Sequence, residues 1–171
     1  MSMDGEYKLT FPDSGRVEWI GFASEKRGTF HSVEEAVLLV GTGIEGEHHA
    51  RNGNSDRQVT LIQAEHLGVI AALTGRETIS PRMLRRNIVV AGINLTALKQ
   101  KQFRIGDVLL EGTIACAPCV RMEENLGAGG FNAMRGHGGL CARVIEHGTI
   151  HTGDAVTYVG DDVTPVDEHA K

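Results

Sequence analysis

Two cysteines separated by two residues lie in the segment 114–121, IACAPCVR, which ends in an arginine. Cys119 follows a proline and precedes Arg121 by two positions. Because the thiolate is the reactive form of cysteine and a nearby cation favours it, Cys119 is the candidate nucleophile or sulfur ligand. Free cysteines also pack as small apolar side chains, and this is the role expected for Cys116, which falls within an expected strand. The same apolar role is the alternative for Cys119.

The same region supplies a candidate zinc site. Cys116, Cys119, His137 and Cys141 are ligand types that Zn²⁺ prefers, in two closely spaced pairs. Cys141 falls in the middle of an expected strand, and a glycine-rich segment separates the two pairs. A non-enzymatic zinc-binding module is therefore the alternative interpretation. A redox CxxC motif needs a thioredoxin-like βαβ context, which the surrounding sequence lacks.

A group of arginines occurs at residues 82–87, RMLRRN, between an expected helix and an expected strand. Guanidinium groups bind phosphate through two parallel hydrogen bonds, so this group could hold a phosphate or another oxyanion. Arg57 and Arg121 would join it if the ends of their strands converge. The alternative is a solvated helix face, which is the usual position of a charged run.

Short alternating apolar segments predict most of the elements that must position these residues. The expected strands are residues 17–22, 35–40, 57–62, 88–90, 102–105, 108–114, 140–145 and 155–159. Helical spacing predicts a helix over 64–74, and Ser80-Pro81 begins a short one that ends near Arg86. Gly-Asp pairs at 106–107 and 153–154 favour hairpin corners. The pattern predicts a mainly β fold with a few short helices, as a barrel or a sandwich.

Length and charge set the class of protein. The 171 residues favour one domain over 16–159, with a flexible arm at 1–15 and a disordered tail at 160–171. The net charge of −5 argues against nucleic-acid binding through a general positive field. No signal peptide and no apolar run near the ~18 residues of a membrane span are found. Three cysteines, an odd number, favour reduced thiols and a cytoplasmic location.

The segment 126–139, LGAGGFNAMRGHGG, contains six glycines and is expected to be a mobile loop. It separates Cys119 from the strand at 140, so it must pass near the site. Phe131 and Met134 are three residues apart and could form one face of a turn. We therefore expect a lid that becomes ordered when a cofactor or a persulfide donor binds.

Six short motifs occur in a consistent order along the chain. They are GIEGEHH at 43–49, RQVTLI at 57–62, RRNIVV at 85–90 with Gly92, FRIGD at 103–107, PC at 118–119, and GGLCARVI at 138–145 followed by GD at 153–154. Together they resemble the MOSC family, named for the C-terminal domain of molybdenum cofactor sulfurases. The resemblance covers residues 17–159 and is strongest to the small stand-alone bacterial members.

The resemblance implies a β-rich barrel and one essential cysteine, which falls on Cys119. In the family this cysteine is thought to carry persulfide sulfur or to ligate molybdenum of a bound pterin. The Arg-x-Asn element that contacts the cofactor in the reductase branch falls on Arg85 and Asn87. Two departures are Arg86, where many relatives have Glu, and the sequence Gly-Glu-His-His at 46–49, where the family usually has Gly-Asp-x-His.

The expected function is therefore that of a molybdenum-cofactor-associated sulfur-handling protein or a molybdopterin-dependent enzyme. Cys119 would carry persulfide or ligate molybdenum, and the pterin phosphate would be held by Arg57, Arg85, Asn87 and Arg121. Fused family members carry a pyridoxal-phosphate cysteine desulfurase, for which this chain is too short. Sulfur and pyridoxal phosphate would then come from a partner such as a cysteine desulfurase. The choice between oxidoreductase and sulfur transferase, and the oligomeric state, are left open.

Overall fold

The structure is a computed structural model that describes residues 8–50, 53 and 55–160. Most of the predicted C-terminal tail, residues 161–171, and the first seven residues of the predicted N-terminal arm lie outside the described residues. The predicted division into arm, domain and tail therefore stays a prediction.

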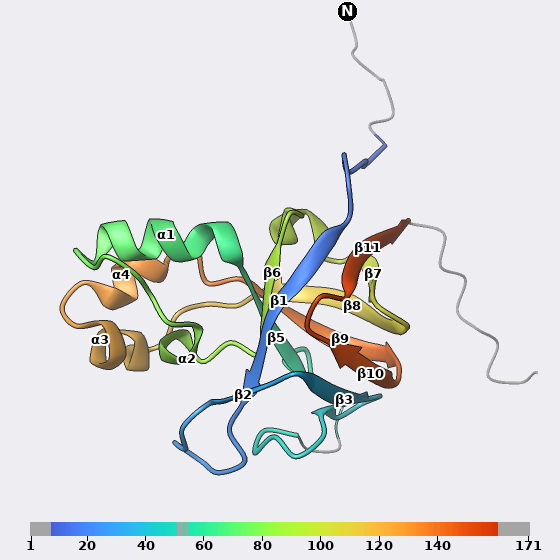
Figure 1. Cartoon of the computed structure of the whole chain (residues 1–171), viewed down its shortest axis with the longest axis horizontal. Helices are drawn as coiled ribbons and strands as arrows, with labels where there is room; N and C mark the ends of the chain where they lie inside the picture. Colours follow the sequence, from blue (N-terminus) through green and yellow to red (C-terminus); the bar gives the residue numbers. More distant parts are fainter. Residues whose placement is uncertain (1–7, 51–52, 54, 161–171) are drawn as a thin grey trace, which may run out of the picture.

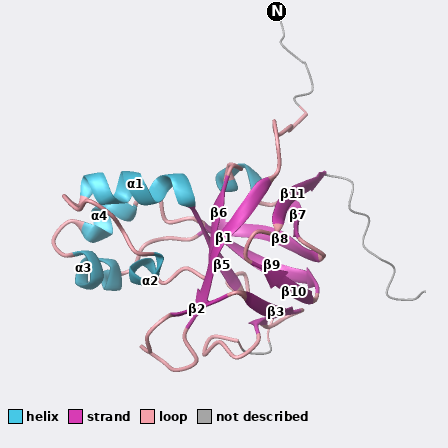
Figure 2. Ribbon diagram, in the orientation of Figure 1, coloured by secondary structure: helices cyan, strands magenta, loops and turns pink. Residues whose placement is uncertain are grey.

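Seven strands form a closed barrel, in the spatial order β11-β7-β8-β9-β5-β6-β1, because β11 also pairs with β1 (Figures 1 and 2). Their bounds are β1 (Gly15–Phe22), β5 (Val59–Gln63), β6 (Ile88–Ala91), β7 (Gln102–Ile105), β8 (Val108–Ala115), β9 (Leu140–Glu146) and β11 (Ala155–Gly160). Neighbouring strands are antiparallel except for β5 and β6, which are parallel. The mainly β fold is confirmed, and of the two architectures expected the barrel is the one observed.

Shorter strands complete the β structure. β2 (His31–Val33) pairs with the end of β1, and a second sheet has the order β10-β3-β4. Its strands are β3 (Glu35–Leu39), β4 (Gly43–Ile44) and β10 (Gly148–His151). Inside the barrel, alternate residues of the strands form one apolar core, which includes Ile20, Leu61, Phe103 and Val144.

Four helices lie together beside the barrel, on the left in Figure 1. They are α1 (Ala64–Leu73), α2 (Pro81–Leu84), α3 (Val120–Leu126) and α4 (Gly130–Met134), and a 3₁₀ helix, η1 (Leu95–Leu98), lies apart from them. A second apolar cluster joins these helices to the outer face of β5 and β6. It includes Ile62, Ile70, Leu84, Val89, Met122, Leu126 and Met134. The helices are held by this shared burial, because each of them is short.

The prediction of a loop over 126–139 is wrong, because this segment contains the end of α3 and all of α4. Met134 is fully buried rather than free to close over the site. The Glu123 carboxylate accepts hydrogen bonds from the backbone N–H groups of Gly129 and Phe131, both at 2.8 Å. Gly130 permits the close approach of α3 and α4, since a Cβ there would overlap the Met122 carbonyl oxygen. Ordering of the segment on ligand binding stays a prediction.

Among the described residues, the longest helix has ten residues, and none of the helices has the length and apolar character needed to cross a membrane.

Candidate functional site

At the junction between α2 and β6, three consecutive polar side chains point in different directions. They are Arg85, Arg86 and Asn87. α2 ends at Leu84, and the next residue, Arg85, has its backbone in the left-handed region with φ of 54°. This conformation is uncommon for a residue other than glycine. It ends the helix and turns the chain into β6, so that Arg86 and Asn87 enter the protein interior with exposed fractions of 6% and 3%. Arg85 stays half-buried at the surface.

Asn87 connects β5, β1 and the loop after β4. Its side-chain oxygen accepts hydrogen bonds from the backbone N–H and the hydroxyl of Thr60, both at 3.0 Å. Its side-chain N–H₂ donates to the Gly21 carbonyl and to the Glu47 carboxylate, both at 3.2 Å. An asparagine amide has two donors and one acceptor oxygen with two lone pairs, so the protein uses its full capacity. Asn87 therefore positions its neighbours, and its predicted contact with a cofactor would require one of these bonds to be replaced.

Arg86 holds together the two ends of the segment that carries Cys119. Its guanidinium donates to the carbonyl of Gly138 at 2.8 Å and to that of Leu84 at 3.0 Å. Longer contacts of 3.4 Å reach the carbonyls of Cys116 and Ala117. Three of these four carbonyls come from the chain just before Cys119 and just before β9. The arginine that departs from the family pattern thus fixes the base of the Cys119 segment.

Arg85 is held in place by the loop that joins β1 and β2. Its guanidinium donates to the Gly28 carbonyl at 2.9 Å and lies 4.7 Å above the centre of the Phe30 ring. Such a contact with an aromatic face stabilises a cation. Burial and the nearby charge of Arg121 lower the pKa of Arg85, whereas Cys119 and Glu47 act in the opposite direction. Arg85 is therefore close to two other members of the site, Cys119 and Arg121.

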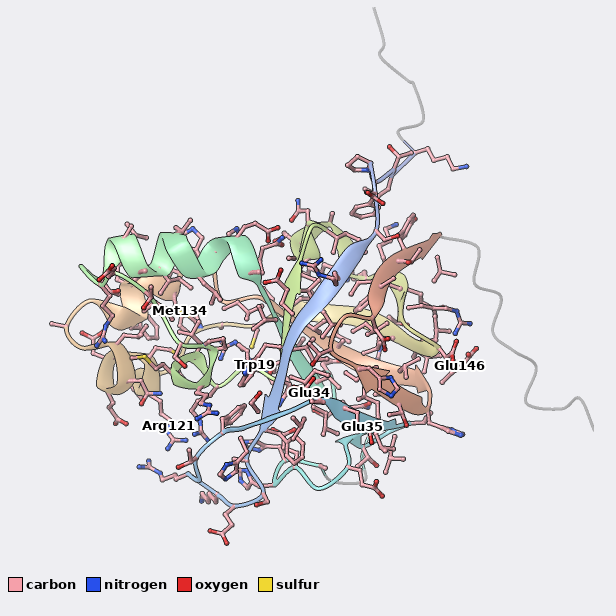
Figure 3. All side chains as sticks on the ribbon, viewed as in Figure 1. Trp19, Glu34, Glu35, Arg121, Met134 and Glu146 are labelled. Atoms are coloured by element: carbon pink, nitrogen blue, oxygen red, sulfur yellow. The ribbon has the colours of Figure 1, made fainter. Side chains whose placement is uncertain are left out.

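Cys119 is the exposed thiol of the three cysteines and lies immediately before α3. Its extended backbone, with φ of −123° and ψ of 170°, leads from the Pro118 turn into the helix. Arg121 occupies the first turn of α3, and Figure 3 shows its side chain beside α2, below the helical layer. Two separate parts of the chain thus meet here: Arg85 comes from the end of α2, and Cys119 and Arg121 come from the start of α3.

Glu47 is a member of this site that the sequence did not single out. It lies in the loop after β4, is 9% exposed, and accepts the hydrogen bond from Asn87. Burial raises the pKa of its carboxyl, although Asn87 and the charge of Arg85 partly offset this. Its place in the GIEGEHH motif was the available signal, but an acidic residue in a polar loop is ordinarily solvated.

The place of Arg57 in the phosphate-binding group stays a prediction. The charge of Arg57 acts on Cys116 and Cys141. Cys116 lies just after β8, which ends at Ala115, rather than within the strand as expected. It is buried, as is Cys141, and the two thiols share a hydrogen bond.

The four predicted zinc ligands are not brought together. Cys119 is exposed, while Cys116 and Cys141 are buried together. The His137 ring packs edge-on against His66, with ring centres 5.2 Å apart, and its Nδ1 is 3.1 Å from the Ala133 carbonyl oxygen. In the described part of the chain, no three His, Cys, Asp or Glu side chains are grouped so that they could bind a metal ion.

The protein is thus a small domain built on a closed seven-stranded β-barrel, with an exposed cysteine and two arginines near the helices beside it. The MOSC domain model matches residues 45–157, so the chain belongs to the MOSC domain family. This interval contains Glu47, Arg85, Asn87, Cys119 and Arg121. A comparison with curated proteins gives no match.

Solved structures confirm the fold. The YuaD protein of Bacillus subtilis is similar, with a TM-score of 0.74 at 22% identity over 84% of this chain and 94% of that one. YiiM of Escherichia coli gives a TM-score of 0.67 at 18% identity over 88% and 72% of the two chains. YiiM of Geobacillus stearothermophilus gives 0.68 at 15% identity over 88% and 78%.

Proposed function

We propose that this chain is a molybdenum-cofactor-associated protein in which Cys119 is the sulfur ligand or sulfur carrier. The observation that carries the proposal is the exposed Cys119 thiol beside Arg85 and Arg121, on a surface whose backbone is fixed by Arg86 and Asn87. Membership of the MOSC family, which is associated with molybdenum cofactor sulfurases, supports the same conclusion.

The chemistry of the donor set fits a molybdenum pterin group. Thiolate is a soft ligand, and two guanidinium groups can bind a phosphate and balance its charge. Cys119 would hold the metal, and Arg85 and Arg121 would hold the pterin phosphate. Phe30 and Gly28 orient Arg85, and Asn87 keeps Glu47 next to it. When bound, the group supplies the redox chemistry, while the protein supplies orientation and charge compensation.

The same thiol can instead carry sulfur. The Cys119 thiolate attacks the terminal sulfur of a donor persulfide, the donor's sulfur–sulfur bond breaks, and the donor leaves as a thiolate. Cys119 is then a persulfide, and no oxidant or reductant is consumed. The donor would be a partner such as a cysteine desulfurase, which would also hold the pyridoxal phosphate. The exposure of Cys119 supports this step, because a bulky donor must reach the sulfur.

The test of this proposal is metal and pterin analysis of protein purified from a host that makes the cofactor. Molybdenum and pterin in equal amounts support the ligand role, and persulfide on Cys119 without metal supports the carrier role. Cys119→Ser should abolish either signal, whereas Cys116→Ser should keep most of it. Bound zinc instead of molybdenum with pterin or of persulfide would contradict the proposal. An equal loss of signal in Cys119→Ser and Cys116→Ser, with both variants folded, would also contradict it.

The phosphate-binding role of Arg85 has a matched control in Arg82, which is exposed on α2. A guanidinium bond to an anion contributes about 1.5–3 kcal/mol, so Arg85→Ala should weaken pterin retention about ten- to hundredfold. Arg82→Ala should leave retention unchanged. Indistinguishable retention in the two variants would remove Arg85 from the site.

A further inference from the structure

Cys116 and Cys141 lie on the same face of the β8–β9 ladder. Ala115 pairs with Leu140, and the backbone N–H of Cys116 donates to the Gly139 carbonyl at 2.9 Å, which extends the ladder by one residue. Residues two apart on a strand point to the same side, so Cys141 faces the same side as Gly139 and Cys116. The two thiols accordingly share a hydrogen bond, although 24 residues lie between them in the chain.

The two thiols are unequal. The hydrogen bond from Cys141, together with the charges of Arg86 and Arg57, lowers the pKa of Cys116 in spite of its burial. The same hydrogen bond and burial raise the pKa of Cys141. Cys116 is therefore the more acidic thiol of the pair, and the Arg86 guanidinium, which reaches the Cys116 carbonyl oxygen at 3.4 Å, is the cation next to it.

Small molecules have room to reach Cys116. A cavity of about 350 Å³ is lined by Cys116 together with Pro118 and with His66, Met134 and Arg135. One water molecule takes up about 30 Å³ in the liquid, so a molecule the size of hydrogen peroxide fits easily. Cys116 is thus a buried residue, 5% exposed, at the wall of a cavity that small oxidants can enter.

We propose that Cys116 and Cys141 are a peroxide-reactive thiol pair that closes to an intramolecular disulfide. The Cys116 thiolate attacks one oxygen of hydrogen peroxide, the oxygen–oxygen bond breaks, and hydroxide leaves and takes up a proton to form water. Cys116 is then a sulfenic acid. Cys141 gives up its proton and attacks that sulfur, the sulfur–oxygen bond breaks, and a second water leaves. The two sulfurs lose two electrons, which the peroxide gains.

The disulfide would join the two ends of the segment that carries Cys119. Residues 117–140 include Cys119, α3 and α4, and Arg86 already bonds both ends of this segment. Diagonal residues of an antiparallel ladder have Cα atoms about 7–8 Å apart, and a disulfide needs about 4.4–6.8 Å. Closure therefore needs only a small movement at the end of β8. The proposal does not depend on which function Cys119 has.

The experiment uses Cys119→Ser, which leaves Cys116 and Cys141 as the two thiols of the chain. After treatment with hydrogen peroxide, both thiols should disappear together and the protein should lose the mass of two hydrogen atoms. Trypsin should then release the peptides 105–121 and 136–143 joined through a bond that a reductant cleaves. In the unsubstituted chain, fragmentation of the joined peptide should place the bond on Cys116 rather than on Cys119.

The double variant Cys119→Ser, Cys141→Ser is the matched control. Without its partner, Cys116 should stop at the sulfenic acid, which dimedone traps, while Cys119→Ser should give little adduct. A stable sulfenic acid in Cys119→Ser itself, with Cys141 still titratable, would overturn the proposal. So would two unreacted thiols after exposure to peroxide that fully oxidises Cys119 in the unsubstituted chain.

Discussion

Arg86→Met tests whether the buried guanidinium holds the base of the Cys119 segment. Methionine has a similar length and no hydrogen-bond donor, so it leaves the carbonyls of Gly138 and Leu84 without these bonds. A hydrogen bond to a charged group contributes about 1.5–3 kcal/mol, so losing two costs about 3–6 kcal/mol. The contacts at 3.4 Å add little.

Part of this cost is offset, because keeping a guanidinium buried itself requires several kcal/mol of desolvation. We therefore expect Arg86→Met to lower the free energy of unfolding by about 2–4 kcal/mol, a large share of the ~5–15 kcal/mol of a typical domain. The free energy of unfolding of Arg86→Lys should lie between those of Arg86→Met and the unsubstituted chain. Lysine keeps the charge but loses the planar guanidinium that reaches several carbonyls.

The assay is urea unfolding followed by the fluorescence of Trp19, the single tryptophan, which packs against the helical apolar cluster. Figure 3 shows Trp19 on β1 between the barrel and the helices. Arg82→Met is the control, because an exposed substitution on α2, four residues before Arg86, should change the free energy of unfolding by no more than about 0.5 kcal/mol. If the free energies of unfolding of Arg86→Met and Arg82→Met agree within that margin, the bonds from Arg86 to the carbonyls do not hold the Cys119 segment.

Two further predictions concern the buried polar group around Asn87. Asn87→Asp replaces the donor to Gly21 and Glu47 with a carboxylate oxygen, so we expect a loss of about 2–4 kcal/mol at neutral pH and a smaller loss in acid. Asn94→Asp is its control, since aspartate caps η1 as well as asparagine does, and equal losses would refute the explanation. Glu47 has a folded-state pKa above its ordinary 4.5, so its contribution to stability is present below 4.5 and is lost as the pH rises through the folded-state pKa. The free energy of unfolding of Glu47→Gln, measured with urea, should therefore increase relative to that of the unsubstituted chain as the pH rises through the folded-state pKa of Glu47. A difference that does not change with pH would contradict the assignment.

The sequence predicts the elements whose signals are local. The hairpin at Gly106-Asp107 is confirmed, because β7 and β8 pair directly across it. The similar pair Gly153-Asp154 is not a hairpin corner, since it leads from β10 in the second sheet to β11 in the barrel. Both turns have the same local chemistry, and only the pairing of distant strands distinguishes them.

The helix α4 could not be predicted for a related reason. Glycine weakens helix propensity, and the glycine-rich sequence gives no regular helical pattern over residues 126–139. Burial of Met122, Leu126 and Met134 against α1 and α2 supplies the stability that propensity does not. Tertiary packing therefore decides this segment.

The arginine group shows how one backbone angle gives neighbouring side chains different surroundings. Arg82, Arg85 and Arg86 are equivalent in the sequence, but the left-handed conformation at Arg85 separates them into exposed, half-buried and buried positions. The charge of Cys119 then acts on Arg85, and the Arg86 guanidinium reaches the Cys116 carbonyl. Because one turn positions both guanidinium groups, a change in its conformation would alter the surroundings of the exposed Cys119 and of the buried Cys116 together.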